Sequence, residues 1–86
     1  MEKTVLVVLV QKRGKNAVRV QKILTTWGCL IKTRLGIHDG VLDKCSDTGL
    51  IILELVGEKK KKQALAGRLR VLPGVKVKLV ELSLAK

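Results

Sequence analysis

The residues best suited to chemistry gather in one short stretch, "LGIHDGVLDKC", which runs from Leu35 to Cys45. It holds the only histidine of the chain, His38, together with Asp39, Asp43 and Cys45. Imidazole, carboxylate and thiolate groups are ligands for zinc, nickel or iron, and a cysteine with a histidine can also form a catalytic pair. The stretch therefore raises two hypotheses, a metal site and a nucleophilic site.

The spacing of these groups favours a simpler interpretation. The sequence has no Cys-x-x-Cys or His-x-x-x-His pair, and adjacent side chains such as His38 and Asp39 diverge in extended backbone. Asp39-Gly40 is instead a typical turn pair within a polar connection between strands. A metal sensor would need His38 to combine with Cys45, or with Cys29 brought near by the fold, and this alternative stays open.

Catalysis finds little support elsewhere in the chain. A nucleophile, a base and an orienting group cannot be assembled from this stretch alone. The sequence also lacks a glycosidase-like carboxylate pair, a Walker loop and a nucleotide fingerprint. We therefore expect a protein that is not an enzyme and that carries no cofactor.

Charge is the strongest bulk property of this chain, whose 86 residues suffice for one small domain. Eighteen Lys and Arg residues against 7 Asp and Glu give a formal net charge of +11. Such a domain attracts polyanions, so a nucleic-acid-binding module is an alternative function. Trp27 is the only aromatic residue, however, whereas single-strand binders generally stack bases on several rings.

The apolar segments are short. The longest run, Val5 to Val10, cannot span a bilayer, and the start of the chain does not resemble a signal peptide. We expect a cytoplasmic protein with no membrane partner, in which Cys29 and Cys45 stay reduced.

Hydrophobic periodicity predicts four strands. Thr4 to Val10 and Leu50 to Val56 are apolar on both faces, as expected of central strands. Ile31 to Ile37 and Val75 to Val80 alternate apolar with mostly basic residues, as expected of edge strands. In the first of these edge strands, the apolar residues, Leu35 and Ile37 among them, are expected to face the core.

Two further segments have the apolar spacing of amphipathic helices. The first is expected to begin at Asn16, as its N-cap, and to stop at Gly28. The second follows Glu58 and ends at the Leu72-Pro73-Gly74 turn. The order βαββαβ predicts an α+β, ferredoxin-like plait with both helices on one face of a four-stranded antiparallel sheet, in the spatial order 4-1-3-2.

Two basic segments could bind anions. Lys59–Lys62 stands near a predicted helix start, although such a run more usually forms a solvated face. Gly14, in "QKRGKNA", is either a flexible turn or a point where a ligand approaches the start of a helix.

The sheet face opposite the helices should be apolar at its centre, with Lys32, Arg34, Lys76 and Lys78 at its margins. Such a surface usually needs a partner, and symmetric self-association is the commonest solution. We therefore expect at least a homodimer. The predicted interface residues are Val5, Val7, Leu9, Ile51, Leu53 and Leu55.

The segments "WGCLIKTRLGIHDG", "GLIILELVG" and "ALAGRLRVLPGVKVKLVEL", from Trp27 to Leu82, carry a family resemblance. They resemble the small ACT-like proteins described as regulators of the iron-only hydrogenase system. More distantly, they are similar to the C-terminal regulatory domain of the nickel-responsive repressor. That repressor domain would need several histidines, whereas this chain has one, and the repressor's separate DNA-binding segment is absent from this sequence.

The resemblance implies an ACT-like fold that oligomerises through its sheets and senses a small effector. Effectors of ACT domains bind near the loop after the first strand, which corresponds here to Arg13, Gly14, Lys15 and Asn16. The usual acidic residue before the glycine is replaced by Lys12 and Arg13, which favours an anionic ligand. The expected function is a non-catalytic, homo-oligomeric regulatory module, such as a transcriptional regulator linked to hydrogenase or redox metabolism, with nucleic-acid binding and metal sensing through His38 and Cys45 as alternatives.

Overall fold

The computed structural model describes residues 1–11, 13–38 and 48–84. Its helices and strands follow the predicted order along the chain. They are β1 (Glu2–Val10), α1 (Arg13–Thr26), the 3-10 turn η1 (Gly28–Leu30), β2 (Ile31–His38), β3 (Gly49–Leu55), α2 (Lys59–Arg70) and β4 (Val75–Ser83).

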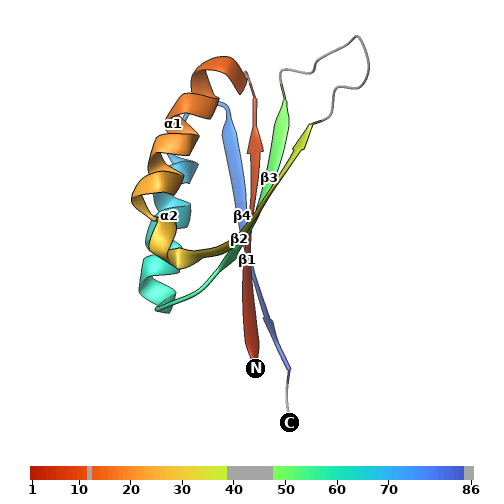
Figure 1. Ribbon diagram of the computed structural model, residues 1–86, viewed down its shortest axis with the longest axis vertical. Coiled ribbons are helices and arrows are strands. Elements are labelled where there is room, and N and C mark those ends of the chain that lie inside the picture. The colour runs from red at the N-terminus through yellow and green to blue at the C-terminus, as the bar shows by residue number, and fades with distance from the viewer. Residues whose placement is uncertain (12, 39–47, 85–86) are drawn as a thin grey trace.

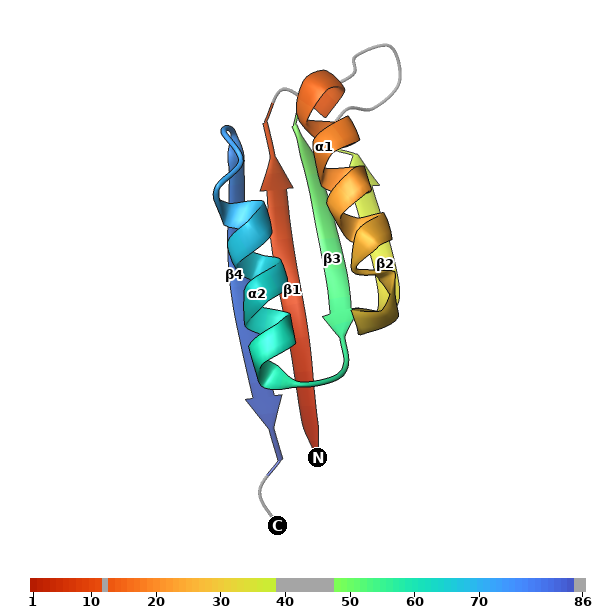
Figure 2. The same cartoon turned by 90° about the vertical axis from the view of Figure 1, so that its left-hand side faces the viewer.

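The four strands form one antiparallel sheet in the order β2-β3-β1-β4. This order confirms the predicted arrangement, with β1 and β3 central. Both helices cover the same face of the sheet, and the opposite face, which we call the open face, carries neither of them (Figure 1). Viewed from the helix side, α2 lies in front of β4 and β1, and α1 lies in front of β3 and β2 (Figure 2). The ferredoxin-like plait is therefore confirmed.

The core lies between the helices and the sheet. In β1, buried and less buried residues alternate, because successive side chains of a strand point to opposite faces. Among the described residues, twelve buried hydrophobic side chains form one cluster: Leu6, Val8, Val10, Val20, Leu24, Leu30, Leu53, Leu55, Leu65, Ala66, Leu69 and Val75.

The register of β3 corrects half of the predicted interface. Leu6 pairs with Leu53 and Val8 with Ile51, so Ile51, Leu53 and Leu55 lie on the helix-covered face, where Leu53 and Leu55 are buried. The open-face positions of β3 are Leu50 and Ile52, which pair with Leu9 and Val7. The prediction was wrong by one residue, although Glu54, the one charged residue of β3, alternates with Leu53 and Leu55 and so shares the face of Leu50 and Ile52.

A bulge corrects the prediction for β2. The pairing of β2 with β3 shifts between Ile31 and Thr33, after which Thr33, Leu35 and Ile37 share the open face. An extra residue in a strand exchanges the two faces for everything that follows. Leu35 and Ile37 therefore do not face the core, and Arg34 and Gly36 take the helix-covered side instead.

The start of α1 also differs from the prediction. The helix begins at Arg13, three residues before the expected N-cap. The Asn16 side chain is instead nearly buried, and its Nδ2 donates to the Gln11 carbonyl oxygen at 2.6 Å. At the other end, α1 stops at Thr26, two residues short of the glycine that was expected to end it.

The turn from α2 to β4 requires its glycine. Gly74 has a φ of 74°, a conformation that residues with a Cβ rarely adopt. A Cβ there would stand 2.8 Å from Asn16 Nδ2, and the Gly74 carbonyl oxygen accepts from the Gln11 N–H at 2.7 Å. The turn thus holds the ends of β1 and β4 together. No helix in the described parts of the chain is both long and apolar enough to cross a membrane.

Candidate functional site

In the predicted effector segment at the start of α1, one side chain already has a hydrogen-bond partner within the chain. Asn16 is bonded to the Gln11 backbone and packed against Gly74, so its amide holds the start of α1 to the end of β1. Lys15 is exposed to solvent. Arg13 and Gly14 form the first turn of α1, and the side chain of Arg13 lies outside what the structure describes. For Asn16, the geometry therefore supports a structural role.

The predicted metal residues are not brought together within the described chain. His38 is the last residue of β2, with its side chain outside the description, and Cys45 lies outside the described residues. Cys29 is free and exposed in η1, at the opposite end of β2. The eight residues of β2 span roughly 26 Å, so Cys29 cannot share a ligand set with His38 in one chain. Among the described residues, no three His, Cys, Asp or Glu side chains form a group that could hold a metal ion.

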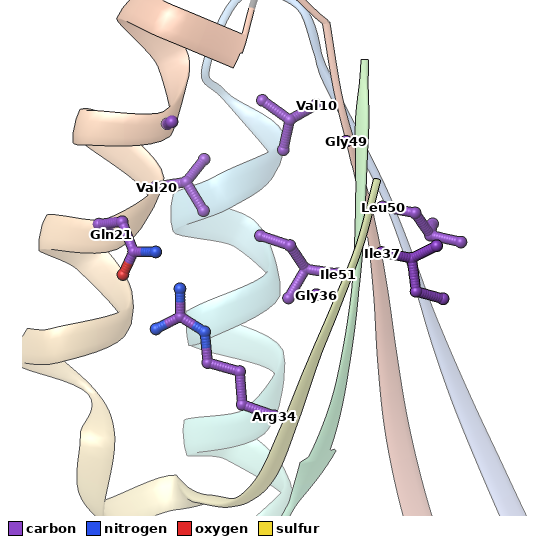
Figure 3. Close-up of a pocket in the computed structure, with 10 residues that line it drawn as sticks. Val10, Val20, Gln21, Arg34, Gly36, Ile37, Gly49, Leu50 and Ile51 are labelled. Carbon is purple, nitrogen blue, oxygen red and sulfur yellow. The ribbon is translucent and has the colours of Figure 1, made fainter. Parts of the chain in front are cut away.

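A groove of about 240 Å³ lies between α1 and the β2–β3 side of the sheet. In Figure 3, Val20 and Gln21 of α1 face Gly36, Ile51 and Arg34 of the sheet across this space. The lining residues are Val10, Ala17, Val20, Gln21, Arg34, Gly36, Ile37, Gly49, Leu50 and Ile51.

Two glycines account for the space. Gly36 and Gly49 occupy helix-facing positions, next to Ile51 and Val10 in the same layer of the sheet. An ideal Cβ at Gly36 would meet no atom within 4 Å among the atoms described. Where the other strands place a valine or leucine under the helices, these two positions have no side chain, and α1 does not fill the gap.

One cation stands at the end of the groove. Arg34 extends from β2 toward α1, with its guanidinium on the side of Gln21 (Figure 3). No carboxylate of the described residues lies within ion-pair distance of it. The sequence pattern placed Arg34 on the open face, and only the bulge at the start of β2 turns it into the groove.

The open face of the sheet is the second candidate surface. In the described parts of the strands, nine apolar side chains share it: Val5, Val7 and Leu9 of β1, Leu35 and Ile37 of β2, Leu50 and Ile52 of β3, and Val80 and Leu82 of β4. Leu9, Leu35 and Ile37 are 43%, 53% and 39% exposed. Lys76 and Lys78 stand beside Leu9 and Val7, on the β4 side.

One carboxylate occupies this face among the described residues. Glu54 Oε2 lies 2.8 Å from Lys3 Nζ and 4.0 Å from Lys32 Nζ, and its Oε1 accepts from the Thr33 hydroxyl at 3.4 Å. The hydrogen bond from Lys3 lowers the pKa of Glu54 below its ordinary value and raises the pKa of Lys3. The Lys3–Glu54–Lys32 cluster closes one end of the apolar patch.

The lysine run at the start of α2 has mixed roles. Lys62 Nζ donates to the buried Thr4 hydroxyl at 2.9 Å, and Lys59 Nζ lies 3.9 Å from a Glu81 carboxylate oxygen. Lys60 and Lys61 are exposed. Part of the run therefore joins α2 to the edge of the sheet, and part is a solvated face.

The sequence profile of the TM1266-like family, described as "Iron-only hydrogenase system regulator, putative", matches residues 3–79. Among proteins of curated function, none matches the chain.

Solved structures extend the comparison. The uncharacterized protein TM1266 from Thermotoga maritima superposes with a TM-score of 0.81 at 27% identity, over 96% of this chain and all of that one. The nitrogen regulatory PII-like protein CPII from Thiomonas intermedia, solved with ADP, AMP and bicarbonate, has a TM-score of 0.59 at 12% identity, over 100% and 98% of the two chains. The de novo designed protein Foldit4 reaches 0.56 at 13% identity, over 99% and 100%. The last two likenesses show the fold alone.

Proposed function

The chain belongs to the TM1266-like family, and from that premise we propose that it is a non-catalytic regulatory module that works as a homo-oligomer joined through its open sheet face. The observation that carries this proposal is the apolar patch on that face. Large patches of this kind on a folded domain typically mark an interaction surface, and self-association is the commonest use.

The energetics support association. Complete burial of one valine, leucine or isoleucine side chain is worth about 1.5–3 kcal/mol. The open face offers nine such side chains among the described residues, all of them at least partly exposed, and association costs about 4–15 kcal/mol in lost motional freedom. Burial of their exposed surface against a second copy supplies a gain of the same order as that cost. Hydrogen bonding along the exposed edges of β2 or β4 could add to it.

Sedimentation equilibrium of the full chain at micromolar concentration tests this proposal. We expect the wild type to be a dimer or larger, and Ile52→Lys, which places a charge at the centre of the patch, to be monomeric. Val18→Lys is the matched control, because Val18 is 69% exposed on α1, away from the open face, and this variant should associate like the wild type. Leu35→Lys, at an exposed position, repeats the test if Ile52→Lys folds poorly. A monomeric wild type, or unchanged association of both open-face variants, would contradict the proposal.

The regulatory role is tested in the host. We expect the Ile52→Lys allele to change the transcript level of the iron-only hydrogenase genes relative to the Val18→Lys allele. Equal transcript levels in the two strains, with both proteins present at normal amounts, would show that self-association of this chain does not regulate the iron-only hydrogenase genes.

Nucleic-acid binding is the second candidate function, favoured by the charge of the chain. Exposed cations lie along both helices and on β4, including Lys60, Arg68 and Lys76. A gel-shift series with DNA and RNA across salt concentrations tests it, since phosphate contacts make affinity fall steeply as salt rises. No binding near physiological salt would reject it.

Two predicted sites stay predictions. Effector binding at Arg13–Asn16 needs a ligand that reaches the first turn of α1 although Asn16 is already bonded. Metal sensing through His38 and Cys45 is tested by elemental analysis of untagged protein, where a metal content near zero would reject it.

A further inference from the structure

We propose that the groove between α1 and the β2–β3 side of the sheet binds a small organic monocarboxylate with an apolar body. Its carboxylate would pair with Arg34, and its body would lie over Gly36 and Gly49. The inference extends the proposed regulatory function by naming an effector class, and it is measurable whether or not the chain self-associates.

The groove differs from the rest of the core because side chains do not fill it. Glycine in a strand interior weakens the strand by roughly 0.5–1 kcal/mol relative to alanine, and it often marks a place where a ligand approaches the backbone. Gly36 and Gly49 both face α1, on neighbouring strands, and an ideal Cβ at Gly36 would point into open space. At the liquid volume of ~30 Å³ per water molecule, the groove of about 240 Å³ has room for on the order of eight non-hydrogen atoms.

The charge in the groove selects the head group of the ligand. The Arg34 guanidinium is a planar fork of donors that fits a carboxylate in a bidentate pair, and no acidic side chain of the described residues neutralises it. A phosphate dianion would call for more cations or a set of free backbone N–H groups, whereas Arg34 is the only cation among the described residues that line this groove. Gln21 adds an amide that can donate to or accept from a polar substituent on the ligand.

The opposite end of the groove is apolar. Val10 and Val20 are almost completely buried, and Ala17 and Ile51 are half-buried beside them. A hydrocarbon body of a few carbons placed here would cover the exposed parts of Ala17 and Ile51 and the bare backbone of Gly36. The groove thus combines one anion-binding end with one apolar end, which is the pattern of a small-molecule pocket with few polar contacts.

The first experiment is a titration of the ¹⁵N-labelled full chain with isocaproate, followed by the backbone amide resonances. We expect saturable shifts at Gly36 and Gly49, and weaker binding by about tenfold or more for isocaproamide, which lacks the charge. Arg34→Gln should lose about the same factor. Lys32→Gln is the matched control, since Lys32 is on the same strand but lies beside Glu54 on the open face, and it should bind normally.

A second variant separates binding from folding. Gly36→Val puts a side chain into the groove at a position where an added Cβ meets no described atom, so it should abolish isocaproate binding while the unfolding midpoint stays equal or rises. Normal binding by Arg34→Gln or Gly36→Val, or no saturable shift at Gly36 and Gly49 in the wild type, would overturn the proposal. Ile52→Lys should bind isocaproate like the wild type. Loss of self-association and loss of isocaproate binding are therefore distinguished by different variants.

Discussion

The two faces of this sheet are built from the same kinds of residue and have different surroundings. On the helix-covered face, Leu6 and Leu53 are fully buried. Their immediate neighbours in sequence, Val5 and Ile52, lie on the open face and keep part of their surface in water. The comparison indicates that the strands carry more apolar side chains than one small core requires. The second set forms the exposed patch on which the proposed self-association rests.

The helix-covered face is itself uneven. Under α2, the sheet is lined by larger side chains such as Leu6 and Leu79, whereas under α1 it carries Gly36 and Gly49. The α2 side of this face is packed, and so are the positions of β3 that hold Leu53 and Leu55, whereas the groove lies only at the end that holds Gly36 and Gly49. The difference is between a filled core and one unfilled end of it, where the ligand is proposed to bind.

The largest expected effect is a difference in the free energy of unfolding between substitutions at two adjacent residues that lie on opposite faces of the sheet. Leu53→Ala should lower the free energy of unfolding by about 2–5 kcal/mol, because it opens a cavity in a fully buried site. Ile52→Ala should cost at most about 1 kcal/mol in the monomer, since this side chain is only partly buried there. Urea denaturation at a concentration that keeps the chain monomeric measures both. Equal losses would mean that the open face is covered within a single chain.

The next effect tests whether the space next to Gly36, on the α1 side, is unfilled in solution. Gly36→Ala should raise the free energy of unfolding by roughly 0.5–1 kcal/mol, because alanine restricts the unfolded chain and its Cβ meets no described atom. Leu35→Ala, one residue away on the open face, should leave the stability of the monomer equal or slightly lower. The same denaturation series compares them. A loss of stability in Gly36→Ala would show that the groove closes in solution.

A smaller effect concerns the lysines beside the patch. If two copies meet through their open faces, Lys76 and Lys78 of each add to the repulsion between two chains of net charge +11. Raising the ionic strength from about 0.02 M to about 0.5 M should therefore tighten association a few-fold, as measured by sedimentation equilibrium. Lys78→Gln should reduce this salt dependence. Weaker association at high salt would instead indicate attractive charge pairs across the contact.

The smallest effect is the pH dependence of the Lys3–Glu54–Lys32 cluster. The pKa of Glu54 is lowered from 4.5 by the Lys3 hydrogen bond, so its ionised form stabilises the folded chain at neutral pH. This contribution is lost as the pH falls through that lowered pKa, below 4.5. Denaturation midpoints of the wild type and Glu54→Gln should differ near neutral pH and converge in acid. A difference that persists in acid would assign the effect to packing.

Much of the fold is predictable from local patterns. The doubly apolar runs of β1 and β3, the alternation in β4 and the spacing of Leu65 and Leu69 in α2 depend only on neighbouring residues, and the βαββαβ order then leaves few arrangements of the sheet. The candidate groove was not predictable in this way. Its cation, Arg34, changes face because of a bulge at the start of β2, whereas the outer face of β3 is marked in the sequence by Glu54.

The sequence by itself determined the elements, their order, the basic charge and the family resemblance, because each depends on residue types and short spacings. Tertiary structure alone decided which alternate set of side chains faces the helices, that Asn16 joins the start of α1 to the end of β1, and that two glycines lie under α1. Side chains in a strand alternate with a period of two, so a single extra residue exchanges inside for outside, and only the pairing of strands distant in sequence fixes that choice.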